Sequence, residues 1–157
     1  LEVYLGFAED MDIQYKYHKN SHARLEFDGR KISRVLINLV KNAWEKLREQ
    51  EGGSITVMLH QERRNLLIRV RDNGAPIPTQ VLPVIFHSFQ TEGKEKGTGL
   101  GLAISKKMVE AHGGEIRAEN LEAGGVQIEI WLPDAYQTTS TKSPAGSDET
   151  LPQAANY

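Results

Sequence analysis

The sequence predicts an α/β fold with two layers, in which helices pack on one face of a mixed, mainly antiparallel sheet. Two amphipathic segments carry apolar residues at helical spacing, and short segments around them carry apolar residues at alternate positions. Strands that are neighbours in sequence mostly form hairpins, so the helices must lie together on one side of the sheet. The order strand, strand, helix, hairpin, loop, helix, hairpin predicts this two-layer sandwich and not a doubly wound sheet.

Composition and charge narrow the classes of function. The 157 residues are enough for one domain with a sizeable core, and a net charge of −2 gives no general electrostatic reason to bind nucleic acid or an acidic membrane. The absence of cysteine excludes a disulfide scaffold, a thiolate nucleophile and a zinc–thiolate site. No stretch has the apolar length of a membrane span and no signal peptide is visible, so we expect a cytoplasmic domain.

The first 28 residues predict a linker end followed by two short strands. Residues 1–11 form either the end of a connecting helix or a first strand, and the start at Leu1 without Met indicates a piece of a longer protein. The alternating apolar residues of DIQYKYHK predict a strand, and ARLEFD at 23–28 predicts a second one. We therefore expect the linker to end at residue 11 and the folded domain to span 12–133.

A long helix is predicted next. Asp28 is a candidate N-cap residue, and the glycine-rich segment EGG at 51–53 predicts the C-terminal end of the helix. Between them, apolar residues recur at spacings of three and four and form a continuous stripe: Ile32, Val35, Leu36, Leu39, Val40, Ala43 and Leu47.

The remaining elements follow from the same patterns. SITVMLHQ and NLLIRVRDNG predict a hairpin with one buried face, and residues 75–99 predict a long polar loop. A second helix, closed by Gly113 and Gly114, and a last hairpin of EIRAEN and VQIEIWLP complete the domain. From residue 134 to 157 the apolar periodicity ends, and we expect a disordered tail.

Two asparagines of the long helix, Asn38 and Asn42 in NLVKNAWEKL, stand four residues apart and so lie on one side of it. That side borders the apolar stripe, which suits amides that line a cleft. An asparagine carbonyl is a hard oxygen ligand suited to Mg²⁺, which keeps several waters and bridges phosphates. The alternative is two ordinary polar residues on the shoulder of a helix.

The end of the predicted strand NLLIRVRD is a second candidate site. A carboxylate such as Asp72, held at the end of a buried strand, can accept a hydrogen bond from an exocyclic amine, and Gly74 beside it would let a flat ring lie against the backbone. The alternative is a turn without a ligand, because Asp-Asn-Gly after a strand is itself a strong turn signal.

A third candidate is KGTGLGL, in which glycines at alternate positions precede the second helix. The N-terminus of a helix has free N–H groups and a partial positive charge, and glycine lets a phosphate approach the backbone. Lys94 and Lys96 in the preceding loop could reach a phosphate, and the length of this polar loop favours a lid. The alternative is a flexible loop that ends where a helix begins.

Taken in order, these motifs resemble the nucleotide-binding domain of the two-component sensor histidine kinases. This family belongs to the superfamily that includes DNA gyrase, the ninety-kilodalton heat-shock chaperone and the mismatch-repair ATPases, whose shared architecture is the Bergerat fold. The resemblance covers about residues 12–133: NLVKNA resembles the N box, DNGAP the first glycine box, FHSF the F box and GTGLGL the second glycine box. AGGVQIEIWLP resembles the closing strand, with Gly125 in the place of its last glycine.

The resemblance implies a role for each matched position. Asn42 would ligate Mg²⁺ between the phosphates, and Asn38 would support this region. Asp72 would bind the adenine amino group, while Gly74 would let the adenine pack. The F box and lid would supply the remaining contacts: Phe86 and Phe89 would anchor the base of the lid, Lys94 would contact the terminal phosphates with a catalytic role beside Asn42, and the phosphate cradle would comprise Thr98, Gly99, Leu100 and Gly101.

Two features depart from the family pattern. Pro76 stands where the family's first glycine box has its second glycine, and proline fixes φ and removes an N–H donor. Pro76 therefore disfavours a flexible hinge at this position and cannot supply a backbone N–H donor. The family's phospho-acceptor segment, a helix with a histidine followed by an acidic residue and an Arg-x-Pro turn, does not occur, and His18 and His22 lack that context and are read as surface residues.

We therefore expect the catalytic ATP-binding domain of a sensor histidine kinase, with ATP and Mg²⁺ as cofactors. It would transfer the γ-phosphoryl to a histidine on a separate dimerisation and phospho-acceptor domain of the same protein, with a response regulator as the downstream partner. The isolated domain would be a monomer that contacts neither nucleic acid nor membrane, although the whole sensor can be membrane-bound.

Three alternatives stay open on the sequence: a hydrolytic ATPase of the same superfamily, a non-catalytic nucleotide-sensing module in which Pro76 impairs the lid, and a serine kinase acting on a regulatory protein. In the hydrolytic members, the resemblance implies a glutamate four residues before the metal-binding asparagine, where this chain has Asn38.

Overall fold

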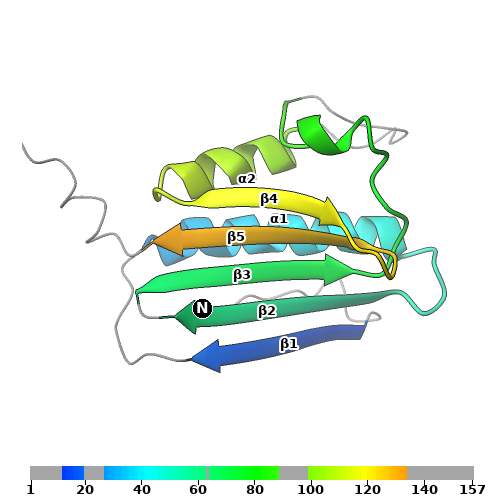
Figure 1. Cartoon of the computed structure of the whole chain (residues 1–157), viewed down its shortest axis with the longest axis horizontal. Coiled ribbons are helices and arrows are strands. Elements are labelled where there is room, and N and C mark those ends of the chain that lie inside the picture. The colour runs from blue at the N-terminus through cyan, green and yellow to red at the C-terminus, as the bar shows by residue number, and fades with distance from the viewer. Residues whose placement is uncertain (1–11, 20–26, 63, 89–98, 134–157) are drawn as a thin grey trace, which may run out of the picture.

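The fold is a single five-stranded sheet with two helices against one of its faces (Figure 1). A computed structural model of the chain describes residues 12–19, 27–62, 64–88 and 99–133. The strand order is β1-β2-β3-β5-β4, and the strands span Asp12–Lys19 (β1), Ser54–Glu62 (β2), Asn65–Asp72 (β3), Glu115–Asn120 (β4) and Val126–Pro133 (β5). The β1–β2 pair is parallel and the other three pairs are antiparallel, so the sheet is mixed and mainly antiparallel, as predicted.

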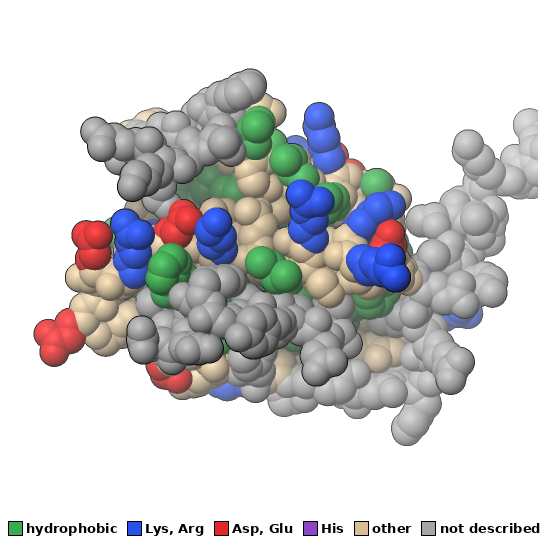
Figure 2. Space-filling view, turned by 180° about the vertical axis from the view of Figure 1, so that it is seen from behind, with side chains coloured by type: hydrophobic (Ala, Val, Ile, Leu, Met, Phe, Trp, Pro, Cys, Tyr) green, Lys and Arg blue, Asp and Glu red, His purple; other side chains and the backbone are tan. Residues whose placement is uncertain are grey.

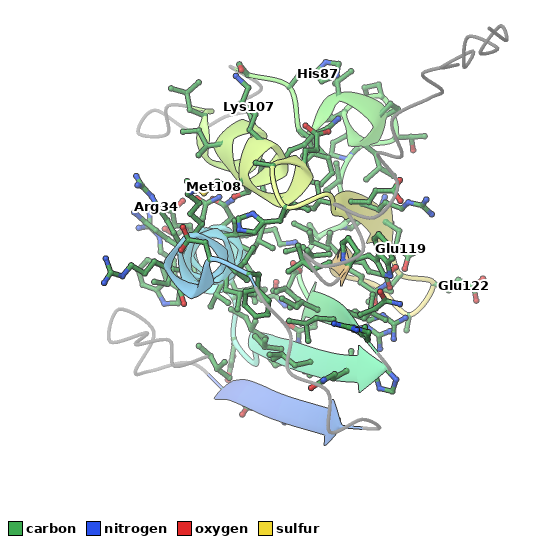
Figure 3. All side chains as sticks on the ribbon, turned by 90° about the vertical axis from the view of Figure 1, so that its left-hand side faces the viewer. Arg34, His87, Lys107, Met108, Glu119 and Glu122 are labelled. Atoms are coloured by element: carbon green, nitrogen blue, oxygen red, sulfur yellow. The ribbon has the colours of Figure 1, made fainter. Side chains whose placement is uncertain are left out.

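The two helices, α1 (Gly29–Leu47) and α2 (Gly101–Glu110), lie on the same side of the sheet. In Figure 1, α1 stands behind the strands and α2 lies above it along β4, and the side view in Figure 3 shows the two helices next to each other. A short 3₁₀ helix, Leu82–Val84, lies in the connection between β3 and α2. The predicted two-layer architecture is confirmed.

Helix α1 begins where the sequence predicts because Asp28 caps it. The carboxylate oxygen Oδ1 accepts hydrogen bonds from the backbone N–H groups of Arg30 (3.1 Å) and Lys31 (3.2 Å). The hydrogen bond from the Lys31 backbone N–H is the largest cause that lowers the pKa of the Asp28 carboxyl below its ordinary value of 3.8. The helix ends at Leu47, before EGG, and a turn closed by a 2.7 Å bond from Gln50 N–H to the Leu47 carbonyl follows.

The strand predicted at 23–28 is wrong at its end. Phe27 lies in a bend and Asp28 is the N-cap of α1, so neither residue is in a strand; residues 23–26 lie outside the described part of the chain. The reason is local, because the Asp28 carbonyl accepts the first helical hydrogen bond from Ile32 N–H at 3.1 Å. The predicted linker end at 1–11 and the predicted tail at 134–157 also lie outside the described residues.

The core lies between the sheet and the helices. The apolar stripe of α1 packs on the inward side chains of the central strands, and all seven residues of the predicted stripe are buried. The strands contribute Ile55 and Val57 from β2, Leu66, Ile68 and Val70 from β3, Ile116 from β4, and Ile130 and Leu132 from β5. This burial fixes which side of α1 faces the sheet, and therefore which side borders the candidate site.

Basic side chains are found on the helix side of the molecule and an ion pair on the outer face of the sheet. Lys and Arg side chains are prominent on the helix side in Figure 2, and Arg34 and Lys107 are labelled on that side in Figure 3, whereas Glu119 lies on the other side. On the outer face of the sheet, Arg69 pairs with Glu129 across β3 and β5 at 2.6 Å. Among the helices of the described residues, none is long and apolar enough to cross a membrane.

Candidate functional site

One edge of α1 carries the candidate site. Asn38, Asn42 and Lys46 follow one another at intervals of four residues, and all three are partly buried. Side chains at this spacing lie along one side of a helix, and eight residues of helix rise by about 12 Å. The edge therefore runs from a first end at Asn38 to a second end at Lys46.

The Asn38 end meets the start of α2. The Asn38 amide Nδ2 donates to the Ser105 hydroxyl at 2.8 Å, and that hydroxyl donates to the Gly101 carbonyl at 2.9 Å. A Cβ at Gly101 would stand 2.5 Å from Oδ1 of Asn38. Asn38 thus packs against the first turn of α2, and Gly101 allows this close approach.

Within the part of the chain that the structure describes, no side chain caps the N-terminus of α2. Its N-cap residue, Leu100, makes no side-chain capping hydrogen bond, and Gly99 before it has φ of +62°, a conformation that favours glycine. The first N–H groups of a helix have no partner inside the helix and attract negative charge. The sequence prediction of an anion-binding turn at this position is compatible with this geometry.

Asn42 lies between the two ends. Its side chain is half-buried and has no hydrogen-bond partner within the described residues. The amide oxygen is therefore available to a ligand, which is the condition that a metal-binding role requires.

The second end of the edge meets Asp72 at the end of β3. The Asp72 side chain is only 8% exposed, and its Oδ1 lies 2.5 Å from the ammonium of Lys46. The same oxygen accepts a 2.9 Å hydrogen bond from the Gly74 backbone N–H. A Cβ at Gly74 would stand 2.6 Å from Cε of Lys46 and 2.9 Å from Cδ2 of Leu47, so this close packing requires glycine.

Two neighbours hold the backbone around Asp72. The Asn73 side chain bridges to the β2 side, where Oδ1 accepts from Ser54 N–H at 2.8 Å and Nδ2 donates to the Gly52 carbonyl at 2.9 Å. Gly125 has φ of +94°, and a Cβ on it would overlap the Asp72 carbonyl oxygen. Gly125, just before the closing strand, therefore lets the chain pack closely against the backbone of Asp72 and Asn73.

The segment that contains Pro76 is held on both sides of the proline. The Asn120 amide forms a pair of 2.8 Å hydrogen bonds with the backbone N–H and carbonyl of Ile77, and Lys46 donates to the Ala75 carbonyl at 3.3 Å. Pro76 lacks an N–H, so the neighbouring residues supply these contacts. This arrangement explains how the segment accepts proline after Gly74.

Several predicted site residues are not brought to this edge by the described structure. Phe86 is half-buried and packs against the hydrophobic core, and its role at the base of the lid stays a prediction. Phe89, Lys94 and Thr98 lie outside the described residues, and their roles stay predictions. His22 also lies outside them, and only the backbone of His18 is described, within β1.

Lys46, Ser105 and Asn120 belong to the site region although the sequence reasoning missed them. Lys46 could have been found, because it continues the four-residue spacing of Asn38 and Asn42. Ser105 and Asn120 carried no such signal, since their partners Asn38 and Ile77 are 67 and 43 residues away in the chain.

A family model and curated relatives match this chain. The model of the histidine kinase-, DNA gyrase B- and HSP90-like ATPases matches residues 27–136. The chain is 35% identical over 148 residues to the signal transduction histidine-protein kinase AfsQ2 of Streptomyces coelicolor, and 40% identical over 116 residues to the sensor histidine kinase WalK of Bacillus subtilis. These alignments cover 91% and 69% of this chain but 26% and 19% of the relatives, so the chain spans about a quarter or less of their length.

Solved structures share the fold. The nucleotide-free catalytic domain of histidine kinase ThkA is 36% identical with a TM-score of 0.68, over 82% of this chain and 84% of that chain. The mycobacterial sensor histidine kinase MprB is 26% identical with a TM-score of 0.70, over 82% and 87%. ThkA in complex with the response regulator TrrA is 32% identical with a TM-score of 0.63, over 82% and 36%. Because the family model and the solved structures match most of its length, the chain belongs to the histidine kinase-, DNA gyrase B- and HSP90-like ATPase family, as the ATP-binding catalytic domain of a sensor histidine kinase.

Proposed function

We propose that this domain binds ATP with Mg²⁺ along the edge of α1 and delivers the γ-phosphoryl to a histidine of a separate dimerisation and phospho-acceptor domain. The observation that carries the proposal is that one helix edge joins a buried carboxylate, Asp72, to the uncapped N-terminus of α2. A carboxylate suits the base amine, and free helix N–H groups suit phosphates, so the nucleotide would lie with its base at the Lys46 end and its phosphates at the Asn38 end.

The residues present fit Mg²⁺ held mainly by phosphate oxygens. Within the described residues, no group of three His, Cys, Asp or Glu side chains could hold a metal ion by itself. Asn42 offers one neutral amide oxygen between the two ends of the site, and Mg²⁺ commonly takes one or two protein ligands plus phosphate and water. When bound, the ion would neutralise charge on the phosphates; the chain itself would orient the nucleotide through Asn42 and the start of α2.

Phosphoryl transfer asks the protein for positioning and for charge stabilisation. In the proposed reaction an acceptor histidine nitrogen bonds to the γ-phosphorus, the bond from this phosphorus to the β–γ bridging oxygen breaks, and ADP leaves. We expect Lys94 to contact the terminal phosphates and Thr98 to help close the cradle, as the resemblance implies. The ThkA complex with TrrA supports a response regulator as the protein that takes the phosphoryl group next.

The kinase is favoured over a hydrolytic ATPase by the side chain at position 38. Asn38 is an amide tied to Ser105, and an amide has no basic lone pair with which to accept a proton from water at neutral pH. Water would therefore be a poor acceptor at this site, and the phosphoryl group would be kept for a histidine.

The test is transfer in trans. The purified chain, γ-labelled ATP with Mg²⁺ and the phospho-acceptor domain of the same protein should yield labelled, acid-labile phosphohistidine, with no labelling of the chain alone. Asn42→Asp should abolish the transfer, while Gln80→Glu, the same amide-to-acid change at an exposed position, should retain it. Parent protein that leaves the acceptor unlabelled while turning over ATP would contradict the proposal.

A further inference from the structure

The two oxygens of the Asp72 carboxylate differ in their hydrogen-bond partners, because Lys46 pairs with only one of them. Oδ1 receives two donors, the Lys46 ammonium at 2.5 Å and the Gly74 backbone N–H at 2.9 Å. Oδ2 accepts no hydrogen bond from any described residue, although the side chain is only 8% exposed. One oxygen is therefore saturated and the other is left for a donor from outside the chain.

The lysine side chain has a close neighbour at Cε as well as partners for its charge. Its Cε lies 2.6 Å from the position that a Cβ of Gly74 would take, and the ammonium also donates to the Ala75 carbonyl at 3.3 Å. With 29% of its side chain exposed, Lys46 is mostly covered. Two acceptors and a close packing contact fix the ammonium, and the ammonium in turn fixes the carboxylate.

We infer that Lys46 is a positioning residue that makes the base site selective for an amino purine. The inference rests on the proposed nucleotide site. By holding Oδ1, Lys46 presents Oδ2 alone to the base, and a lone carboxylate oxygen accepts the 6-amino group of adenine. A 6-oxo purine offers an oxygen at the same position, which a carboxylate oxygen repels.

Removal of the ammonium has two consequences for the carboxylate. Asp72 loses a charged partner in a mostly buried place, and only the Gly74 backbone N–H is left to hold Oδ1, so the carboxylate turns more easily and its orientation toward the base is less well defined. Both weaken the recognition of the amino group. Neither changes how the phosphates are held at the other end of α1. The loss of binding affinity should therefore come from the base contact and not from the phosphate contacts.

The experiment compares ATP with inosine triphosphate, which lacks the 6-amino group. Lys46→Met keeps an apolar stem of similar length over Gly74 and removes the charge. Lys41→Met is the matched control, because Lys41 is exposed on the same helix and its ammonium stands 3.9 Å from Glu45. Calorimetry should give a loss of about 3- to 10-fold in affinity for ATP in Lys46→Met, the size of one hydrogen bond, and at most about 2-fold for inosine triphosphate. Lys41→Met should match the parent for both.

A double-mutant cycle separates positioning from mere packing. In an Asp72→Asn background Lys46→Met should have little further effect on ATP, because the carboxylate that Lys46 positions is gone. Equal losses for the two nucleotides, additive effects in the cycle, or parent-like ATP affinity in Lys46→Met would each overturn the inference while leaving the proposed function intact. Failure of the parent itself to bind ATP would overturn both. Thermal unfolding of each variant shows whether the fold is retained, and an unfolded Lys46→Met is replaced in the same cycle by Lys46→Gln.

Discussion

The side-chain amide of Asn38 donates a 2.8 Å hydrogen bond to the hydroxyl of Ser105, across the interface between α1 and α2. Ser105 is 2% exposed, and its hydroxyl donates in turn to the Gly101 carbonyl. The position at which the resemblance implies a glutamate in hydrolytic ATPases is therefore used here to hold the first turn of α2. The same side chain that bears on transfer to histidine as against hydrolysis of ATP therefore also holds the two helices together.

The purified chain should hydrolyse ATP barely above background. Without a general base at position 38, a contribution often worth about 10²- to 10⁴-fold is missing. Phosphate release, measured with saturating ATP and Mg²⁺, tests this expectation. Steady turnover at about 1 per second or faster, an ordinary enzyme rate, would favour the hydrolytic ATPase instead.

Asp72→Asn should weaken ATP binding by roughly 10- to 100-fold, because a hydrogen bond to a charged group contributes about 1.5–3 kcal/mol. Isothermal calorimetry on the parent and the variant measures the two dissociation constants. Asp12→Asn, the same change at an exposed position at the start of β1, is the control and should bind like the parent. Equal affinities in Asp72→Asn and the parent would remove Asp72 from the base site.

Ser105→Ala should lower the free energy of unfolding by about 1–3 kcal/mol, because it leaves the Asn38 amide N–H in the helix interface without its acceptor. Denaturant unfolding of parent and variant gives the difference. Ser88→Ala, at an exposed position, should change the free energy of unfolding by less than about 0.5 kcal/mol. A stable Ser105→Ala would mean that the Asn38 contact contributes little to helix packing.

Two adjacent glycines allow a clean test of the support behind Asp72. Gly124 and Gly125 both have positive φ, +90° and +94°, but only at Gly125 would a Cβ overlap the Asp72 carbonyl. Backbone strain alone should cost about 1 kcal/mol of unfolding free energy in Gly124→Ala, and Gly125→Ala should cost clearly more. Because the overlap displaces Asp72, ATP affinity should fall in Gly125→Ala and stay parent-like in Gly124→Ala. Matching values for the two variants would count against the contact.

The N-cap of α1 should make the free energy of unfolding depend on pH at the acid end. The folded-state pKa of Asp28 is lowered from 3.8, so its contribution is fully present above that value and is lost as pH falls through the lower folded pKa. Asp28→Asn keeps a capping side chain but cannot titrate. The melting temperature of the parent should therefore fall more steeply than that of Asp28→Asn when pH is lowered from 5 towards 3. Parallel profiles would contradict the assignment.

Much of the fold could be predicted from local pattern. The stripe from Ile32 to Leu47 predicts α1 and its buried face, because burial of one helical face imposes that spacing. Alternation in β2, β3 and β5 likewise predicts hairpin strands with one inward face. The error at Phe27 and Asp28 arose where apolar alternation competed with a capping residue, and the first hydrogen bonds of the helix decided the outcome.

By itself, the sequence determined the family, the order of the elements from α1 to β5 and the residue types at the two ends of the site, because motif spacing and apolar periodicity are properties of neighbours along the chain. Only the tertiary structure decided what those residues touch. It brought together the hydrogen-bonded pairs Asn38–Ser105 and Asn120–Ile77 and the ion pair Lys46–Asp72. The partners in these pairs are 67, 43 and 26 residues apart in the chain. Such contacts depend on which faces of α1, α2 and the sheet are buried together, and the geometry of a hydrogen bond is satisfied only after that burial has brought the side chains within reach.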